Sequence, residues 1–157
     1  MKNSDRNALI TFPLLLIIGF LFALAGSQEG TMVAGIPLYC LLVGLVFLIQ
    51  LLAFIPAFLL QTERFYDITG SLTYISITIL AILFSKAVNG RSLLLMVLVL
   101  IWATRLGTFL FRRIQKAGKD DRFDEIKPSF IKFLYACTIQ ALWVISTAAA
   151  ALIAPSR

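Results

Sequence analysis

The sequence contains no histidine, and only 14% of its 157 residues are charged. Without imidazole side chains, the chain cannot form histidine-ligated metal sites, Ser-His triads or histidine-based acid-base centres. Its longest segment outside the apolar runs, 112–129, is too short to form a soluble domain. Any catalysis must therefore use tyrosine, lysine, aspartate, glutamate or a cofactor.

Cysteine is rare as well, because only Cys40 and Cys137 occur and both lie within apolar runs. This setting favours small core residues over a disulfide or a reactive thiol. The chain also lacks the alternating pattern of a membrane β-barrel and the paired interrupted helices of inverted-repeat transporters. Helices remain the only way to cross a membrane, and transport is disfavoured.

What the sequence has in abundance is apolar residues, at 60%, with a mean hydropathy of +0.93. An apolar helix of about 20 residues spans a bilayer. We therefore predict an integral membrane protein of the all-α class, a polytopic helical bundle that forms one membrane domain, 1–157. The expected spans are 9–25, 36–60, 68–84, 92–111 and 130–154, with a charged cytoplasmic hairpin at 112–129.

The first apolar run has two interpretations. Lys2 and Arg6 precede it, and the residues 23–25 near its end match the small-residue pattern of a signal-peptidase site. We favour a retained helix over a cleaved signal, because the run is long for a signal core. Small residues on one side of this helix should let another helix approach closely. They are Gly19, Ala23 and Gly26.

Basic residues are distributed unevenly over the segments between the spans. With the N-terminus in the cytoplasm, ten of them lie inside and three outside, as the positive-inside rule requires. The inner ones are Lys2, Arg6, Arg64, Arg112, Arg113, Lys116, Lys119, Arg122, Lys127 and Lys132, and the outer ones are Lys86, Arg91 and Arg157. We predict a cytoplasmic N-terminus and an external C-terminus, in a bacterial inner membrane. The net positive charge then faces anionic lipid and requires no nucleic-acid partner.

Polar residues in the third span recur with helical spacing. Asp67, Ser71, Tyr74 and Thr78 lie on one face, which should look into the bundle because lipid cannot satisfy polar groups. In one interpretation Asp67 caps the helix N-terminus and the hydroxyls bond to neighbouring helices. In the other, the face contacts a ligand.

Candidate catalytic residues lie around the stretch "QTERFYD", 61–67, between the second and third spans. Glu63, Tyr66 and Asp67 form the densest group in the chain that could donate or accept a proton. A phenol can protonate an enolate or hydrogen-bond a carbonyl, so Tyr66 and Tyr74 are the candidate polarising groups.

Arg105 lies about two turns inside the fourth span, where an unpaired charge facing lipid is costly. Helical spacing places Arg105, Thr108 and Arg112 on one cationic face. We expect either an internal partner or anion, with Asp67 as the candidate counter-ion, or a side chain that extends toward the headgroups. The following hairpin carries six cations and four anions, and this mixture indicates an ordered structure able to present Arg or Lys to a phosphate.

Two stretches support a resemblance to a known family. "ERFYDITGSLTY", 63–74, and "RLGTFLFRRIQKAGKDDRFDEIKPSF", 105–130, closely resemble the N-terminal half of an uncharacterised multi-pass membrane family grouped with steroid 5-alpha reductases. "QALWV", 140–144, is similar to the next helix of that family. The resemblance covers most of the chain from the second span onward.

The resemblance implies an enzyme that uses NADPH to reduce a carbon-carbon double bond conjugated to a carbonyl in a lipid. A carboxylate and a tyrosine would polarise the carbonyl, which makes Glu63, Tyr66 and Tyr74 the candidate catalytic residues. Arg105, Arg112 and Arg113 would bind the NADPH phosphates. More distant relatives with a similar helical core are isoprenylcysteine methyltransferases, which use S-adenosylmethionine.

The family's cofactor motifs follow the region that this chain matches, and they are missing here. We therefore expect a truncated or split reductase-like protein, inactive alone or completed by a second polypeptide. The alternative is a non-catalytic bundle that binds membrane lipid or protein partners, and a methyltransferase-like enzyme is a third possibility. None of these interpretations requires a metal or nucleic acid.

Overall fold

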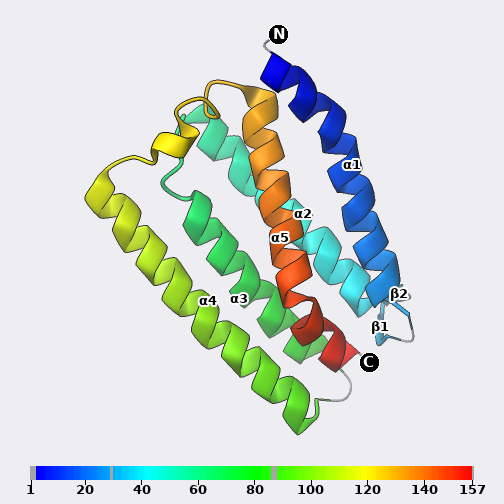
Figure 1. Ribbon diagram of the computed structural model, residues 1–157. Helices are drawn as coiled ribbons and strands as arrows, with labels where there is room; N and C mark the ends of the chain where they lie inside the picture. The colour runs from blue at the N-terminus through cyan, green and yellow to red at the C-terminus, as the bar shows by residue number, and fades with distance from the viewer. Residues whose placement is uncertain (1–2, 29, 86–87, 157) are drawn as a thin grey trace.

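The computed structural model describes residues 3–28, 30–85 and 88–156, and these residues form a helical bundle (Figure 1). All five of its long helices are long and apolar enough to cross a membrane, which confirms the all-α membrane fold. They are α1 (Asn3–Gly26), α2 (Leu38–Leu59), α3 (Tyr66–Phe84), α4 (Gly90–Ala117) and α5 (Phe130–Ser156). Three basic residues used to predict the orientation, Lys2, Lys86 and Arg157, lie outside the described residues, and the orientation stays a prediction.

The helices α2, α3 and α5 pack against one another at the centre of the bundle, with α1 at one edge and α4 at the other (Figure 1). The helix α1 packs on α5 and α2, whereas α4 packs mainly on α3 and less on α5. The apolar core draws on all five helices. Because α4 is an edge helix, most of the side chains on its outer side are exposed.

The small-residue stripe of α1 does allow a close approach, and the partner is α2. A Cβ atom at Gly19 would meet the ring of Phe47, and one at Gly26 would meet the ring of Tyr39. Ala23 is buried in the same contact region. Aromatic side chains of α2, and not the backbone of another helix, thus fill the space that the glycines leave.

Short connections join the helices. A turn at Ala34 and Gly35, both with positive φ, joins β1 (Met32–Val33) to β2 (Ile36–Pro37) ahead of α2. The helix α4 begins at a capping box, in which Asn89 Oδ1 accepts from the Ser92 N–H at 2.9 Å and Ser92 Oγ accepts from the Asn89 N–H at 3.1 Å. It ends at Gly118, whose φ of +80° fits the expected glycine C-cap.

The polar face of α3 looks into the bundle, as predicted. Ser71, Tyr74 and Thr78 are buried, and the side chain of Asp67 is 21% exposed. Asp67 lies in the first turn of α3, where the helix dipole favours an anion, but its side chain makes no capping hydrogen bond and the N-cap residue is Phe65. Asp67 instead faces α4, where Arg113 lies.

Candidate functional site

The helix α4 continues to Ala117, so the predicted hairpin, 112–129, is wrong in its first six residues, which are helical. We call the charged segment after α4, residues 118–129, the hairpin. It folds back on the turn between α2 and α3, and we call this end of the bundle the hairpin end. Glu63 in that turn holds the segment in position through two hydrogen bonds. Its Oε1 accepts from the Asp120 N–H at 3.0 Å, and its Oε2 accepts from Lys127 Nζ at 2.7 Å. Burial alone would raise the pKa of Glu63, but the bonds from Lys127 and Asp120 outweigh it and lower that pKa. Glu63 is therefore an ionised structural carboxylate, and it has no proton to give at neutral pH.

Ion pairs hold the rest of the segment. Arg122 makes a two-pronged contact with the Asp120 carboxylate, and its hydrogen bond lowers the pKa of Asp120. Lys119 Nζ lies 2.9 Å from Asp121 and 3.1 Å from Asp124, and its hydrogen bonds to them raise the pKa of Lys119 to about 12. The segment is ordered, as predicted. However, the cations Lys119, Arg122 and Lys127 already contact carboxylates of this segment or of Glu63, which reduces their attraction for a phosphate.

Aromatic packing completes this anchorage. The short 3-10 helix η1 (Asp121–Phe123) inserts Phe123 between Tyr66 and Phe133, with ring centroids 4.8 and 5.9 Å away. The Tyr66 hydroxyl donates to the Ala136 carbonyl at 2.8 Å. Tyr66 is thus a packed side chain whose proton is engaged by the backbone of α5.

Tyr74 lies two turns further along α3, and like Tyr66 it is a packed side chain whose hydroxyl is hydrogen-bonded to α5. Its hydroxyl contacts Thr147 Oγ1 and lies 3.5 Å from the Trp143 carbonyl, while its ring packs edge-on against Trp102 at 5.0 Å. The three predicted catalytic residues therefore do not converge: Glu63 joins the hairpin, Tyr66 joins α5 at the hairpin end, and Tyr74 joins α5 deeper in the bundle.

A groove of about 950 Å³ runs along the outer side of α4, and we call it the α4 groove. Its lining residues all belong to α4: Leu100, Ile101, Thr104, Arg105, Thr108, Phe109, Arg112, Arg113 and Lys116. The predicted cofactor residues Arg105, Arg112 and Arg113 thus come together. Sequence reasoning missed Lys116 as part of this site, although its i+4 spacing from Arg112 was readable.

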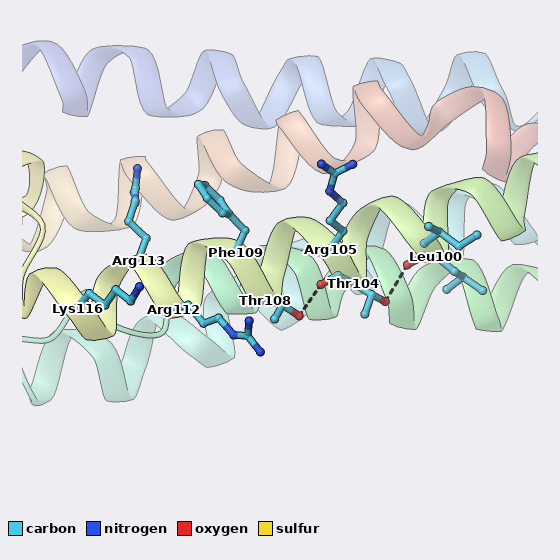
Figure 2. Close-up of a pocket in the computed structure, with 9 residues that line it drawn as sticks. Leu100, Thr104, Arg105, Thr108, Phe109, Arg112, Arg113 and Lys116 are labelled. Atoms are coloured by element: carbon cyan, nitrogen blue, oxygen red, sulfur yellow. Dashed lines mark hydrogen bonds between the residues drawn. The ribbon is translucent and has the colours of Figure 1, made fainter.

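The cations of the α4 groove point in different directions (Figure 2). The guanidinium groups of Arg105 and Arg113 lie on one side of the helix, and that of Arg112 lies on the other side, near Thr108. Both threonine hydroxyls in the groove donate to helix carbonyls, Thr104 to Leu100 at 2.8 Å and Thr108 to Thr104 at 2.7 Å. The cationic side chains therefore dominate the polar character of the groove.

The expected pairing of Arg105 with Asp67 is wrong. Arg113 Nη2 takes that place, 3.6 Å from Asp67 and 3.6 Å from Asp120. Arg105 is exposed, and within the described ranges no carboxylate lies within 4.0 Å of Arg105, Arg112 or Lys116. The α4 groove thus holds three cations that have no carboxylate partner. A fourth cation in the groove, Arg113, has two.

A second groove, of about 730 Å³, lies between α1, α5 and the hairpin. Its cations are Arg122, which contacts Asp120, and Lys132, whose Nζ lies 3.6 Å from Asp5. Because carboxylates already neutralise both, this groove attracts anions less than the α4 groove does.

The α4 groove fits the phosphates of an implied NADPH but does not fit the whole cofactor. Three unneutralised cations match phosphate charge. A bound small molecule normally buries most of its surface between several walls, and every lining residue here comes from a single helix. Across residues 3–28, 30–85 and 88–156, the structure also contains no cluster of three metal-ligating side chains.

A family model described as "Protein of unknown function (DUF1295)" matches residues 53–157, about two thirds of the chain. The chain belongs to the DUF1295 family. The match spans the whole of α3, α4, the hairpin and α5, and therefore every candidate site residue. No curated protein and no solved structure matched this DUF1295 chain.

Proposed function

We propose that this DUF1295 protein is a membrane-embedded bundle whose α4 groove binds the phosphate headgroup of an anionic lipid. The observation that carries the proposal is the set of three cations without a carboxylate partner, Arg105, Arg112 and Lys116, in one groove at the hairpin end. Juxtamembrane basic residues attract anionic lipid by about 1 kcal/mol each. The hairpin, by contrast, neutralises its own cations.

The positions of these cations suit a phospholipid. Arg112 and Lys116 lie near the end of α4, where a lipid phosphate would be found. Arg105 lies seven residues before Arg112, roughly 10 Å along the helix axis, so its long side chain would extend toward the headgroups to reach the same lipid. Further along, Leu100 and Ile101 offer an apolar surface to an acyl chain.

The test is lipid binding to the purified protein in a neutral detergent. Phosphatidylglycerol should bind and raise the melting temperature, and phosphatidylcholine should do so much less, because a ligand that binds the native state stabilises it. A triple variant, Arg105→Gln with Arg112→Gln and Lys116→Gln, should bind phosphatidylglycerol about a hundredfold more weakly, at roughly fivefold for each cation.

Arg64→Gln is the matched control. Arg64 is an exposed arginine at the same end of the bundle, but it does not line the α4 groove. Its replacement should leave phosphatidylglycerol binding unchanged within twofold. A loss in Arg64→Gln equal to the average loss per cation in the triple variant would show general charge attraction and would reject the groove as the site.

The second candidate is a reductase-like role, in which the chain contributes to NADPH-dependent reduction of a lipid enone or enoyl group. What favours it is that Arg105, Arg112 and Arg113 line one groove within the region that matches the DUF1295 family. Millimolar NADPH should then raise the melting temperature of the wild-type protein, whereas NADH, which lacks the additional phosphate, should raise it less. Stabilisation by phosphatidylglycerol with no response to NADPH would favour the lipid site alone.

A further inference from the structure

A second groove on the surface of α4, of about 340 Å³, runs between α3 and α4, and we call it the α3–α4 groove. Its walls come from both helices, whereas the lining of the α4 groove belongs to α4 alone. The helix α4 contributes two small buried residues, Ala103 and Gly107. Leu72 and Ile75 line it from α3, and Leu72 is 54% exposed. The groove is therefore open at the outer surface of the bundle, and beside these four residues it is apolar.

The polar end of the α3–α4 groove lies at the hairpin end of the bundle. Arg112 and Gln115 line it there, close to the last residue of α4, and Ile68 lines it near the first residue of α3. Arg112 is the only arginine or lysine in this lining, and within the described ranges no carboxylate lies within 4.0 Å of it. The groove thus runs from an unpaired cation into apolar side chains, and this polarity matches an anionic lipid with an acyl chain.

A ridge separates the two grooves of α4. It consists of Thr104, Thr108 and Arg112, which line both grooves and recur at every fourth position of the helix. Both threonine hydroxyls donate to helix carbonyls, so the ridge offers no free hydroxyl proton to a polar ligand. Arg105 and Arg113 line the α4 groove but not the α3–α4 groove, and their guanidinium groups lie on the side of α4 opposite to that of Arg112 (Figure 2). Arg112 is therefore the cation that the two grooves share.

We propose that the α3–α4 groove binds one acyl chain of an anionic phospholipid whose phosphate is bound by Arg112. An apolar groove alone would accept the chain of any lipid, and the unpaired cation at its end selects a lipid with a negatively charged headgroup. The second chain of the same lipid lies on the other side of the ridge, against Leu100 and Ile101. This inference rests on the proposed function, because it specifies how the lipid of the α4 groove is held.

Tryptophan reporters and brominated lipids can test this placement in vesicles. The only two tryptophans of the chain, Trp102 and Trp143, line neither groove and are first replaced by phenylalanine. One reporter is then introduced: Leu72→Trp in the α3–α4 groove, Ile101→Trp in the α4 groove, or Leu48→Trp on α2, outside both. All three positions are exposed, so these changes leave the core intact.

The measurement is quenching by phosphatidylglycerol and by phosphatidylcholine, each brominated in its acyl chains. The Leu72→Trp reporter should prefer phosphatidylglycerol about fivefold, the ratio expected for one basic residue, and the Leu48→Trp reporter should show less than a twofold preference. Adding Arg112→Gln should abolish the preference at position 72. Arg105→Gln is the matched control, because it removes an equal charge from the opposite side of α4 and should leave that preference unchanged within twofold.

Several outcomes would overturn the proposal. A preference at position 72 that survives Arg112→Gln, or that equals the preference at position 48, would show general attraction to the charge of the protein. Absence of quenching at position 72 by either lipid would show that a second copy or another protein covers the groove. A preference at position 101 alone would leave the proposed α4 site standing and place both chains outside the α3–α4 groove. No preference at any of the three positions would reject the proposed function as well.

Discussion

Lys127 Nζ donates to Glu63 Oε2 at 2.7 Å and joins two residues that are 64 positions apart in the sequence. Both side chains are largely shielded from water, with 18% of Lys127 and 5% of Glu63 exposed. The same carboxylate receives the Asp120 N–H, so one residue of the α2–α3 turn binds the hairpin at two points. The hairpin position therefore depends on Glu63 more than on the exposed ion pairs around it.

Replacing Glu63 should destabilise the protein. Glu63→Gln leaves Lys127 as a largely buried cation without its partner, and breaking such a pair costs about 3 kcal/mol. Unfolding of the purified protein in a denaturing detergent should show this loss relative to wild type. Glu125→Gln, at an exposed position in the same segment, should cost less than about 0.5 kcal/mol. If the cost at Glu63 comes from the unpaired lysine, adding Lys127→Met to Glu63→Gln should restore part of the stability.

Acid should release the hairpin. The pKa values of Glu63 and Asp120 are lower in the folded protein than their ordinary values of 4.5 and 3.8. Both groups therefore bind protons more readily in the unfolded chain, and the stability they contribute is complete above those ordinary values. It is lost as the pH falls below about 4 and through the folded pKa values. A series of melting temperatures between pH 7 and pH 3 should show the decline, and Glu63→Gln should make the acid limb shallower.

Arg105 and Arg113 should respond differently to replacement by leucine. Arg105 has no carboxylate partner within the described part of the chain, so Arg105→Leu should be neutral or slightly stabilising in an apolar helix. Arg113→Leu removes the cation that lies 3.6 Å from both Asp67 and Asp120 and should lower the free energy of unfolding by about 1 kcal/mol or more. A larger loss for Arg105→Leu than for Arg113→Leu would contradict this assignment of partners.

The contact between α3 and α4 depends on Gly107. A Cβ atom there would meet Ser71 Cβ at 2.6 Å, so Gly107→Ala should push the two helices apart and cost about 1–3 kcal/mol. Gly44 on α2 is the matched control, because a Cβ atom at Gly44 meets nothing within 4 Å. Gly44→Ala should be neutral or stabilising through helix propensity. Combining Gly107→Ala with Ser71→Gly should recover most of the loss, and detergent unfolding would measure all three effects.

The features that could be predicted from the sequence are those that depend on the spacing of residues within one helix. Long apolar runs identified the five helices, and the spacing of Ser71, Tyr74 and Thr78 identified the buried side of α3, because lipid cannot satisfy a polar face. Arg105, Thr108 and Arg112 line one groove, as their spacing predicted, although the guanidinium groups of Arg105 and Arg112 point to opposite sides of α4. Each of these predictions needs only the periodicity of one helix.

Partner choice between helices could not be predicted in this way. Spacing places Arg105 and Arg113 on a helix but does not fix the rotation of that helix against α3, so the wrong arginine was assigned to Asp67. Glu63 and Tyr66 looked available for catalysis because Lys127 and the Ala136 carbonyl, which bind them, are more than 60 positions away. A cavity of about 170 Å³ between α3, α4 and α5 was missed for the same reason, since Gln140 of α5 lines it together with Asp67 and Tyr74 of α3.

The anchorage of the hairpin has a consequence for how the protein is assembled. Glu63 in the turn and Tyr66 on α3 precede the hairpin in the sequence, as does Phe54 on α2 in the same aromatic cluster. Synthesis from the N-terminus therefore completes most of the docking surface before Phe123 and Lys127 are made. The charged segment can therefore pack against the folded α2–α3 pair during translation. The helix α5 then enters the membrane next to a segment that is already bound to that pair.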